Sequence, residues 1–290
     1  MLLIVGTIPD PDLPLSEGEA RLAGPNLVAA GREMPVNRGT LALAAAAAAT
    51  LAYLKKPAPF VCLAGDIGKG GGSRLVYEHL ERTLPDREFG VICFHYLQPD
   101  VDWHNRVLFA VQEMNPRPLL IADAGFMYVA KMSGQAAEYD LFTPDAGELA
   151  FLADETAPHP FYTRGFILHE NNRVPDLIAR AYAHQNAARY LLVKGETDYL
   201  ADSTGILATV AEPRLEALEA IGGTGDTLTG MAAALIAAGY NLETAAVLAA
   251  RANRLAGLLA APTPATQVGE IIQYIPEALA ELQESVSGEQ

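Results

Sequence analysis

Residues 221–230 read IGGTGDTLTG, and a run of small and aliphatic residues follows them. The hydrophobic spacing over residues 228–238 predicts an amphipathic helix, so Gly223, Thr224 and Gly225 lie at its start. The first amides of a helix have no partner within the helix and lie at the positive end of its dipole. Glycines there allow a ligand to approach the backbone closely. The stretch therefore predicts a binding site for a phosphate group.

A single carboxylate, Asp226, falls in the first turn of the same helix. Beside a phosphate, a carboxylate is useful chiefly as a general base that accepts a proton from an attacking hydroxyl group. The stretch also fits an ordinary helix start, with Thr224 as the N-cap and Asp226 favourable in the first turn. We favour the functional interpretation because Gly-Gly-x-Gly exceeds what a cap requires.

Short apolar runs recur along the chain, and helical patterns separate them. Continuous apolar runs without alternation are typical of strands buried on both faces of a parallel sheet. Their alternation with helices predicts an α/β fold with a mostly parallel sheet. The predicted strands are residues 2–5, 60–63, 91–94, 119–122, 140–142 and 190–193, and the helices between them are 40–54, 74–83, 103–114, 147–154 and 175–188.

Residues 199–210 differ, because two short runs flank Asp202-Ser203-Thr204-Gly205, which predicts a hairpin. The chain after the hairpin is predicted to be almost wholly helical, at residues 226–238, 242–259 and 270–283. In an open parallel sheet, ligands bind beyond the carboxyl ends of the strands. We therefore expect functional residues directly after the strands, at Gly6-Thr7, Gly65-Asp66, His95, Asp123, Thr143 and Lys194-Gly195.

Composition limits the classes of partner. The 290 residues are half hydrophobic, no linker or repeat divides them, and we predict one domain over residues 1–290. The net charge of −15, with no basic cluster longer than Lys55-Lys56, disfavours nucleic acids and anionic membranes as partners. The chain has only two cysteines, and it has no signal-peptide pattern, no membrane-length apolar run and no zinc-binding histidine spacing. These features predict a cytoplasmic protein.

The segment GGTGDTLTGMAAALIAAG (residues 222–239) resembles the Gly-x-Gly-Asp signature of the ribokinase-like superfamily. Gly-Thr-Gly-Asp before a helix of small residues is most similar to the ATP- or ADP-dependent NAD(P)H-hydrate dehydratases. The resemblance implies a three-layer α/β/α fold, an anion hole formed by Gly223, Thr224 and Gly225, nucleotide binding beside Gly222, and Asp226 as the catalytic base. Thr227 departs from the aliphatic residue usual in the dehydratases and is more similar to the sugar kinases.

Three other segments support the resemblance. LFTPDAGEL (141–149) resembles the dehydratase motif Thr-Pro-His-Pro-Gly-Glu, which implies a Mg²⁺ site formed by Glu148, through water, and by Asp145, which replaces the His or Asn of the motif. LLVKG (191–195) implies that Lys194 and Gly195 lie near the nucleotide phosphates. IADAG (121–125) places Asp123 where it contacts substrate or caps the next helix. On spacing alone, a turn before a helix with an acidic first turn explains the first segment equally well. Without the other motifs, a solvent-exposed lysine at a strand end would be the preferred interpretation of the second.

Two further loops are candidates for the substrate side. AGDIGKGGGSR (64–74) matches neither a P-loop nor a dinucleotide fingerprint, and its Asp66 lines either a substrate wall or a surface loop. PVNRGT (35–40) presents Asn37 and Arg38 at a helix start, for a phosphate-bearing substrate or as a plain capping loop. The resemblance covers residues 60–285, whereas residues 1–58 depart most from the family pattern.

The leading hypothesis is an ATP-dependent enzyme, with ATP or ADP and Mg²⁺ as cofactors, that phosphorylates a hydroxyl group of a small molecule. The resemblance implies hydrated NAD(P)H as the substrate, followed by loss of phosphate. A second hypothesis is a carbohydrate or vitamin-type kinase that releases a phosphorylated product, which Thr227 and the altered Asp145-Ala146 loop favour. A third is a nucleotide-binding protein without catalysis. The sequence leaves the oligomeric state open, a homo-oligomer included.

Overall fold

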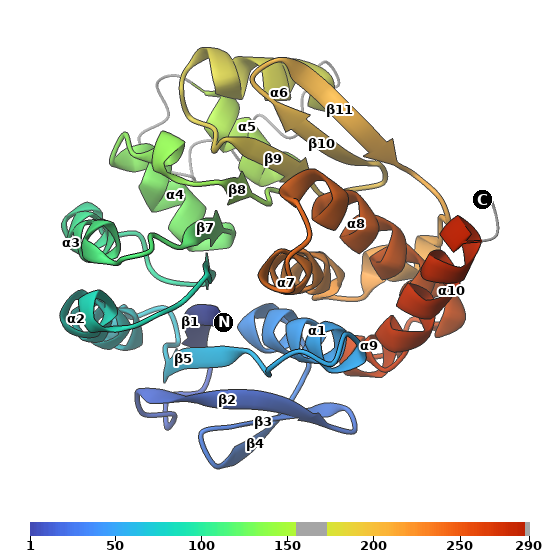
Figure 1. Cartoon of the computed structure of the whole chain (residues 1–290), viewed down its shortest axis with the longest axis horizontal. Coiled ribbons are helices and arrows are strands. Elements are labelled where there is room, and N and C mark those ends of the chain that lie inside the picture. Colours follow the sequence, from blue (N-terminus) through green and yellow to red (C-terminus); the bar gives the residue numbers. More distant parts are fainter. Residues whose placement is uncertain (155–172, 288–290) are drawn as a thin grey trace. The chain divides into compact units, whose positions relative to one another are not determined.

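The computed structural model describes residues 1–154 and 173–287 (Figure 1). The chain forms two compact units. The first unit comprises Met1–Leu2, Ser16–Val61 and Val210–Gln290, and the second comprises Leu3–Leu15 and Cys62–Thr209.

The second unit is built on a sheet with strand order β11-β10-β9-β8-β7-β6-β1-β5. β6 to β9 pair in parallel, and β10 pairs antiparallel with β9. Each of the predicted apolar runs lies in a strand, and their side chains are mostly buried, which confirms the predicted mixed α/β fold with a mostly parallel sheet. The strands are β1 (Leu2–Ile8), β5 (Phe60–Gly65), β6 (Val91–Phe94), β7 (Leu119–Ala122), β8 (Leu141–Phe142), β9 (Tyr190–Val193), β10 (Asp198–Asp202) and β11 (Gly205–Val210).

The predicted hairpin is confirmed by β10 and β11, which are neighbours in the sheet. The Asp202 carboxylate accepts hydrogen bonds from the backbone N–H and the hydroxyl group of Thr204, at 2.7 and 2.6 Å. This side chain therefore stabilises the turn in the way that Asp commonly does.

Along the chain, the helices of the second unit alternate with its strands, as predicted (Figure 1). The sequence analysis considered Asp123 as the cap of a following helix but gave no range for that helix, α4, because a short apolar run does not distinguish a helix from a strand. The helix predicted at residues 175–188 is too long: α6 ends at Ala183, and Gln185 has φ +58, which a helix does not accommodate. The helices are α2 (Gly71–Thr83), α3 (Val101–Glu113), α4 (Ala124–Met132), α5 (Ala146–Ala153) and α6 (Val174–Ala183), with single 3₁₀ turns η1 (Leu84–Asp86) and η2 (Ala136–Glu138).

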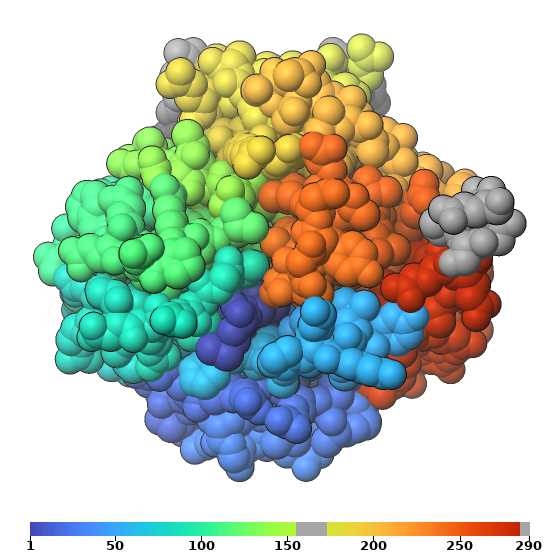
Figure 2. Space-filling model, viewed as in Figure 1, coloured from blue at the N-terminus to red at the C-terminus, as the bar shows by residue number. Residues whose placement is uncertain are grey.

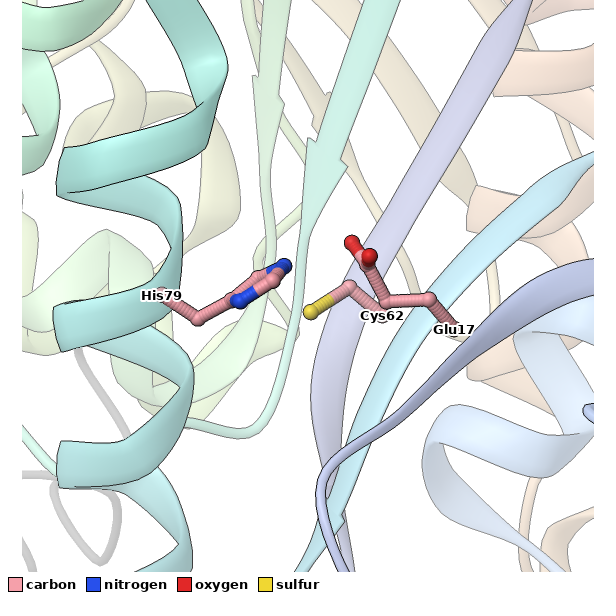
Figure 3. A group of neighbouring side chains, drawn as sticks. All are labelled: Glu17, Cys62 and His79. Carbon is pink, nitrogen blue, oxygen red and sulfur yellow. The ribbon is translucent and has the colours of Figure 1, made fainter.

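Both cysteines are buried free thiols of the second unit. Figure 3 shows Cys62 on β5 and His79 on α2 pointing toward each other. Cys93 lies on β6, where burial raises the pKa of its thiol far above the ordinary value. Burial keeps the Cys93 thiol protonated, and the burial of both thiols agrees with a packing role.

The first unit begins with an antiparallel meander that the sequence reading missed. It consists of β2 (Ser16–Ala23), β3 (Asn26–Ala29) and β4 (Arg32–Pro35). The turn between β3 and β4 has positive φ at both Ala30 (+50) and Gly31 (+74), as in the two-residue turns that match the twist of a hairpin. Most side chains of β2 and β4 are at least partly exposed, so no continuous apolar run marks these strands.

Helices make up the rest of the first unit, and α1 packs against α7 within it, the blue and orange segments of Figures 1 and 2. Every residue of α1 from Gly39 to Leu51 is buried. A Cβ atom on Gly230 of α7 would lie 2.1 Å from the Leu43 carbonyl oxygen, so the two helices approach at backbone distance. The helices are α1 (Gly39–Tyr53), α7 (Thr224–Ala237), α8 (Leu242–Leu259), α9 (Val268–Ile272) and α10 (Ile275–Ser287), with the 3₁₀ segment η4 (Glu216–Ala220).

Among the described residues, none of the helices combines the length and the hydropathy that crossing a membrane requires.

Candidate active site

The glycine motif forms the start of α7. The helix begins at Thr224, and Gly223 is its N-cap with φ +101 and no side-chain capping hydrogen bond. The Thr224 hydroxyl does not act as the cap, and instead lies 3.4 Å from the Ile221 carbonyl oxygen. The capping role suggested for Thr224 is therefore wrong. The first amides of α7, from Thr224 to Asp226, lie at a helix start without a capping side chain.

Gly223 is required by its surroundings as well as by its φ angle. A Cβ atom there would lie 3.1 Å from the Cα atom of Arg38 and 3.1 Å from Cγ1 of Val268. A Cβ on Gly222 would lie 4.0 Å from Cβ of Arg38. The glycine motif thus packs directly on the segment that precedes α1, and the structure brings Gly222, Gly223 and Arg38 together. The exposed side chains of Asn37 and Arg38 lie on this segment.

Asp226 is held by the start of a second helix. Its Oδ2 atom accepts a hydrogen bond of 2.7 Å from the backbone N–H of Gly39, the first residue of α1. Gly39 has φ +67, a conformation that favours glycine. The positive ends of α1 and α7 both favour negative charge at this carboxylate. The start of α1 thus orients the Asp226 carboxylate, as suits a general base.

A residue that the sequence analysis missed, Asn253 of α8, fixes the first turn of α7. Its Nδ2 donates to the Thr224 carbonyl oxygen at 3.0 Å. The Thr227 hydroxyl lies 2.6 Å from Asn253 Oδ1 and 2.7 Å from the same carbonyl oxygen. Thr227, which the sequence comparison singled out as unusual, therefore links the motif to α8. An asparagine in the middle of an alanine-rich helix was the available signal.

In the second unit, the predicted residues Asp123 and Lys194 form an ion pair. Lys194 follows β9, and its Nζ donates to both carboxylate oxygens of Asp123, at 2.9 and 2.8 Å. The Asp123 side chain is 1% exposed and that of Lys194 is 11% exposed. Asp123 is also the N-cap of α4, since its Oδ1 accepts from the Ala124 N–H at 2.8 Å. Of the two roles considered for Asp123, helix capping is thus observed.

Asp145 and Glu148 form a capping box at the start of α5. Asp145 Oδ1 accepts from the Glu148 N–H, and Glu148 Oε2 accepts from the Asp145 N–H, each at 2.8 Å. The Lys194 N–H donates to the Pro144 carbonyl oxygen, which ties this segment to the end of β9. Burial of the carboxyl group raises the pKa of Glu148 to about 8; the Lys194 charge opposes the rise, and Asp123 and Asp145 add to it. The ends of the parallel strands β7, β8 and β9 thus carry four predicted site residues in one cluster: Asp123, Asp145, Glu148 and Lys194.

Two other predicted residues of the second unit have local roles. The Gly195 N–H donates to Asp198 Oδ1 at 3.1 Å, next to the cluster in sequence. His95, after β6, is fully buried, and its Nε2 lies 3.9 Å from Asp123 Oδ2.

Asp66 organises its own glycine-rich loop. Its Oδ1 accepts from the N–H groups of Gly68, Lys69 and Gly70, and its Oδ2 accepts from both the N–H and the hydroxyl group of Ser73, at 2.9 to 3.0 Å. Partial burial opposes ionisation, but the hydrogen bonds from Ser73, Gly70 and Lys69 outweigh it and lower the pKa of Asp66 below 3.8. The carboxylate itself therefore lies at the anion-favouring start of α2.

We expect Asp66→Asn to destabilise the protein by about 1–2 kcal/mol at pH 7, because an amide donor replaces the oxygen that accepts from Ser73. A carboxyl group with a lowered pKa contributes stability above pH 3.8 and loses it as the pH falls through the pKa of the folded state. The difference between wild type and variant should therefore shrink on acidification to pH 3. Urea denaturation at both pH values measures it, and a pH-independent difference would contradict this account of Asp66.

Comparison with known proteins assigns the chain to a family. Residues 98–277 match the carbohydrate-kinase family model described as NAD(P)H-hydrate dehydratase. An uncharacterized protein of Methanocaldococcus jannaschii is 42% identical over 231 residues, which cover 79% of this chain and 95% of that protein.

Two solved structures share the fold at low sequence identity. One is phosphofructokinase-2 of Escherichia coli in complex with fructose-6-phosphate, with a TM-score of 0.54 and 16% identity over 97% of this chain and 100% of that one. The other is pyridoxal kinase of Staphylococcus aureus in complex with pyridoxal, with a TM-score of 0.55 and 13% identity over 87% and 85%.

The fold is that of the ribokinase-like kinases, as predicted, and the protein is an enzyme of this class. Within the class, the chain belongs to the NAD(P)H-hydrate dehydratase family. Both the predicted superfamily and the predicted branch are confirmed.

Proposed function

We propose that the protein transfers a phosphoryl group from ATP or ADP to a hydroxyl group of hydrated NAD(P)H, and that loss of the phosphate then restores the dinucleotide. The observation that carries this proposal is the start of α7, where backbone amides without a capping side chain adjoin an acid held by the Gly39 N–H. Family membership supplies the substrate class.

The phosphoryl-transfer step has a suitable group for each of its parts. Asp226 accepts the proton of the substrate hydroxyl group as its oxygen attacks the terminal phosphorus, and the bond from that phosphorus to the remaining nucleotide breaks. The amides of Thr224 and Gly225 stabilise the charge on the phosphoryl oxygens, with Gly222 and Gly223 giving access to them. Lys194, with Gly195 beside it, binds nucleotide phosphate as a point charge. In the second step the C–O bond breaks with phosphate as the leaving group, and loss of a neighbouring proton restores the double bond.

The direct test is to incubate the protein with hydrated NADH and either ATP or ADP and to follow the absorbance of NADH. We expect regeneration of NADH with release of inorganic phosphate, and dependence on the nucleotide. Folded protein that regenerates no NADH with either nucleotide would rule out the dehydratase function.

A second candidate function is a small-molecule kinase whose product keeps the phosphate. The observation in its favour is Thr227, a residue more similar to that of the sugar kinases at this position. Its hydroxyl group donates a hydrogen bond to Asn253 Oδ1. Detection of a stable phosphorylated product, rather than free phosphate, would favour this function over the dehydratase.

The donor set at the start of α5 fits Mg²⁺, which prefers carboxylate oxygens and retains water. The capping box uses one oxygen each of Asp145 and Glu148, so a second oxygen on each carboxylate is outside the box. Glu148, with Asp145, would hold the ion through water. When bound, Mg²⁺ would neutralise part of the phosphate charge.

We expect Glu148→Gln to raise the Mg²⁺ concentration needed for half-maximal activity at least about tenfold. Glutamine can keep the capping box, because its amide oxygen also accepts from the Asp145 N–H. Activity measured against Mg²⁺ concentration tests this, with an unchanged melting temperature as the control for folding. An unchanged Mg²⁺ requirement would remove Glu148 from the metal site.

Several predictions from the sequence stay open. They are a substrate role for Asn37, Arg38, Asp66 and Asp123, the single domain over residues 1–290 with its divergent residues 1–58, a cytoplasmic location and a homo-oligomeric state.

A further inference from the structure

Asp123 is fixed in place by its backbone as well as by its side chain. Its N–H donates to the Phe94 carbonyl oxygen at 3.0 Å, across β6 and β7. The next residue, Ala124, has φ +49, which is uncommon for any residue other than glycine. A Cβ on Gly125 would lie 2.4 Å from the Leu97 carbonyl oxygen. Backbone strain of this kind persists where the surroundings enforce it, and it concentrates at functional sites.

The buried carboxylate is engaged with a cation rather than open to solvent. Both its oxygens accept from Lys194 Nζ, and it is 1% exposed. Breaking a buried pair by removing one partner leaves an uncompensated charge, so the two groups depend on each other. Lys194 in turn is anchored through its backbone to Pro144. The end of β7 therefore holds the ammonium group of Lys194, and the end of β8 holds its backbone.

We propose that Asp123 is a positioning residue: it holds the Lys194 ammonium group at the carboxyl ends of β7 to β9, so that a phosphate-bearing ligand meets a cation already oriented and partly desolvated. This role rests on the proposed nucleotide role of Lys194 and differs from direct contact of Asp123 with substrate. A free lysine side chain loses rotamer entropy when it binds an anion, and fixing it before the ligand arrives removes that cost from binding.

A positioning role of Asp123 and a purely electrostatic role predict opposite effects of its removal on anion binding. If Asp123 acted only through its negative charge, its removal would strengthen the binding of an anion. If it positions Lys194, its removal weakens binding. ADP binding should be measured by calorimetry for wild type, Asp123→Asn, Lys194→Met and the double variant. We expect each single variant to bind ADP about tenfold more weakly, and the double variant to bind no more weakly than Lys194→Met, because the two changes remove one interaction.

A second readout does not depend on ADP. The ¹H–¹⁵N signals of lysine ammonium groups should include a slowly exchanging Lys194 Nζ resonance that Lys194→Met and Asp123→Asn both lose. Asp123→Ser provides a second variant if Asp123→Asn does not fold, because serine keeps a capping acceptor for α4 without a charge. Circular dichroism establishes that each variant is folded.

The outcomes separate the two proposals. If Lys194→Met binds ADP like wild type, the nucleotide role of Lys194 is wrong and the inference fails with it. If Lys194→Met binds weakly while the Asp123 variants bind as tightly as wild type or more tightly, or if the effects add in the double variant, only the positioning role is overturned.

Discussion

Asp226→Asn is expected to lower kcat at least about 100-fold, because the variant lacks the proton acceptor that activates the substrate hydroxyl group. The substitution keeps the shape of the side chain, and its amide oxygen can still accept the Gly39 N–H that Asp226 Oδ2 accepts at 2.7 Å. The loss should therefore appear in the rate at saturating substrate and nucleotide. Initial rates of NADH regeneration measure it.

The matched control is Asp202→Asn, the same chemical change on the exposed β10–β11 turn. It should leave kcat unchanged. If Asp226→Asn retained the wild-type rate with an unchanged melting temperature, the assignment of Asp226 as the general base would be wrong. A nucleotide-binding role without catalysis would remain if neither wild type nor variant turned over.

A large loss of stability is expected from Gly230→Ala. The added methyl group would lie 2.1 Å from the Leu43 carbonyl oxygen and 2.9 Å from the Leu43 carbonyl carbon. Both are backbone atoms of a buried helix, so α1 and α7 would have to move apart. We expect a loss of about 3 kcal/mol or more in the free energy of unfolding, at the upper end of the usual cost of overpacking. Denaturant unfolding measures this loss.

Gly71→Ala is the control for that substitution. Gly71 is the first residue of α2, and a Cβ there has no atom within 4 Å and no positive φ to oppose it. Replacing glycine by alanine in a helix should be neutral or stabilising by up to about 1 kcal/mol. Equal effects of the two substitutions would contradict the close approach of α1 and α7.

The sequence predicts the strands that are buried on both faces of the sheet. Val91–Phe94 and Tyr190–Val193 are continuous apolar runs because both faces of their strands are buried, and short unbroken runs between turn residues indicate such strands. The β2–β4 meander escapes prediction, since its exposed strands show no apolar run. α4 escapes prediction because its apolar run is short, and a short apolar run fits a buried strand as well as a helix.

The candidate site divides in the same way. Residue types directly after strands identify Asp123 and Lys194, because the carboxyl ends of parallel strands share one edge of the sheet. Their pairing across 71 positions of the chain needs the three-dimensional register. The hydrogen bond from Gly39 to Asp226 and the contact of Asn253 with Thr227 likewise come from tertiary packing, for which a single sequence carries no distance information.

The hydrogen bond between Gly39 and Asp226 provides a built-in reporter. The amide proton of Gly39 senses whether a carboxyl group 187 positions further along the chain carries a proton. Its NMR chemical shift should therefore change when that acid gains or loses a proton. An acid–base titration of the resting enzyme could then be followed at one glycine signal, with neither nucleotide nor substrate present.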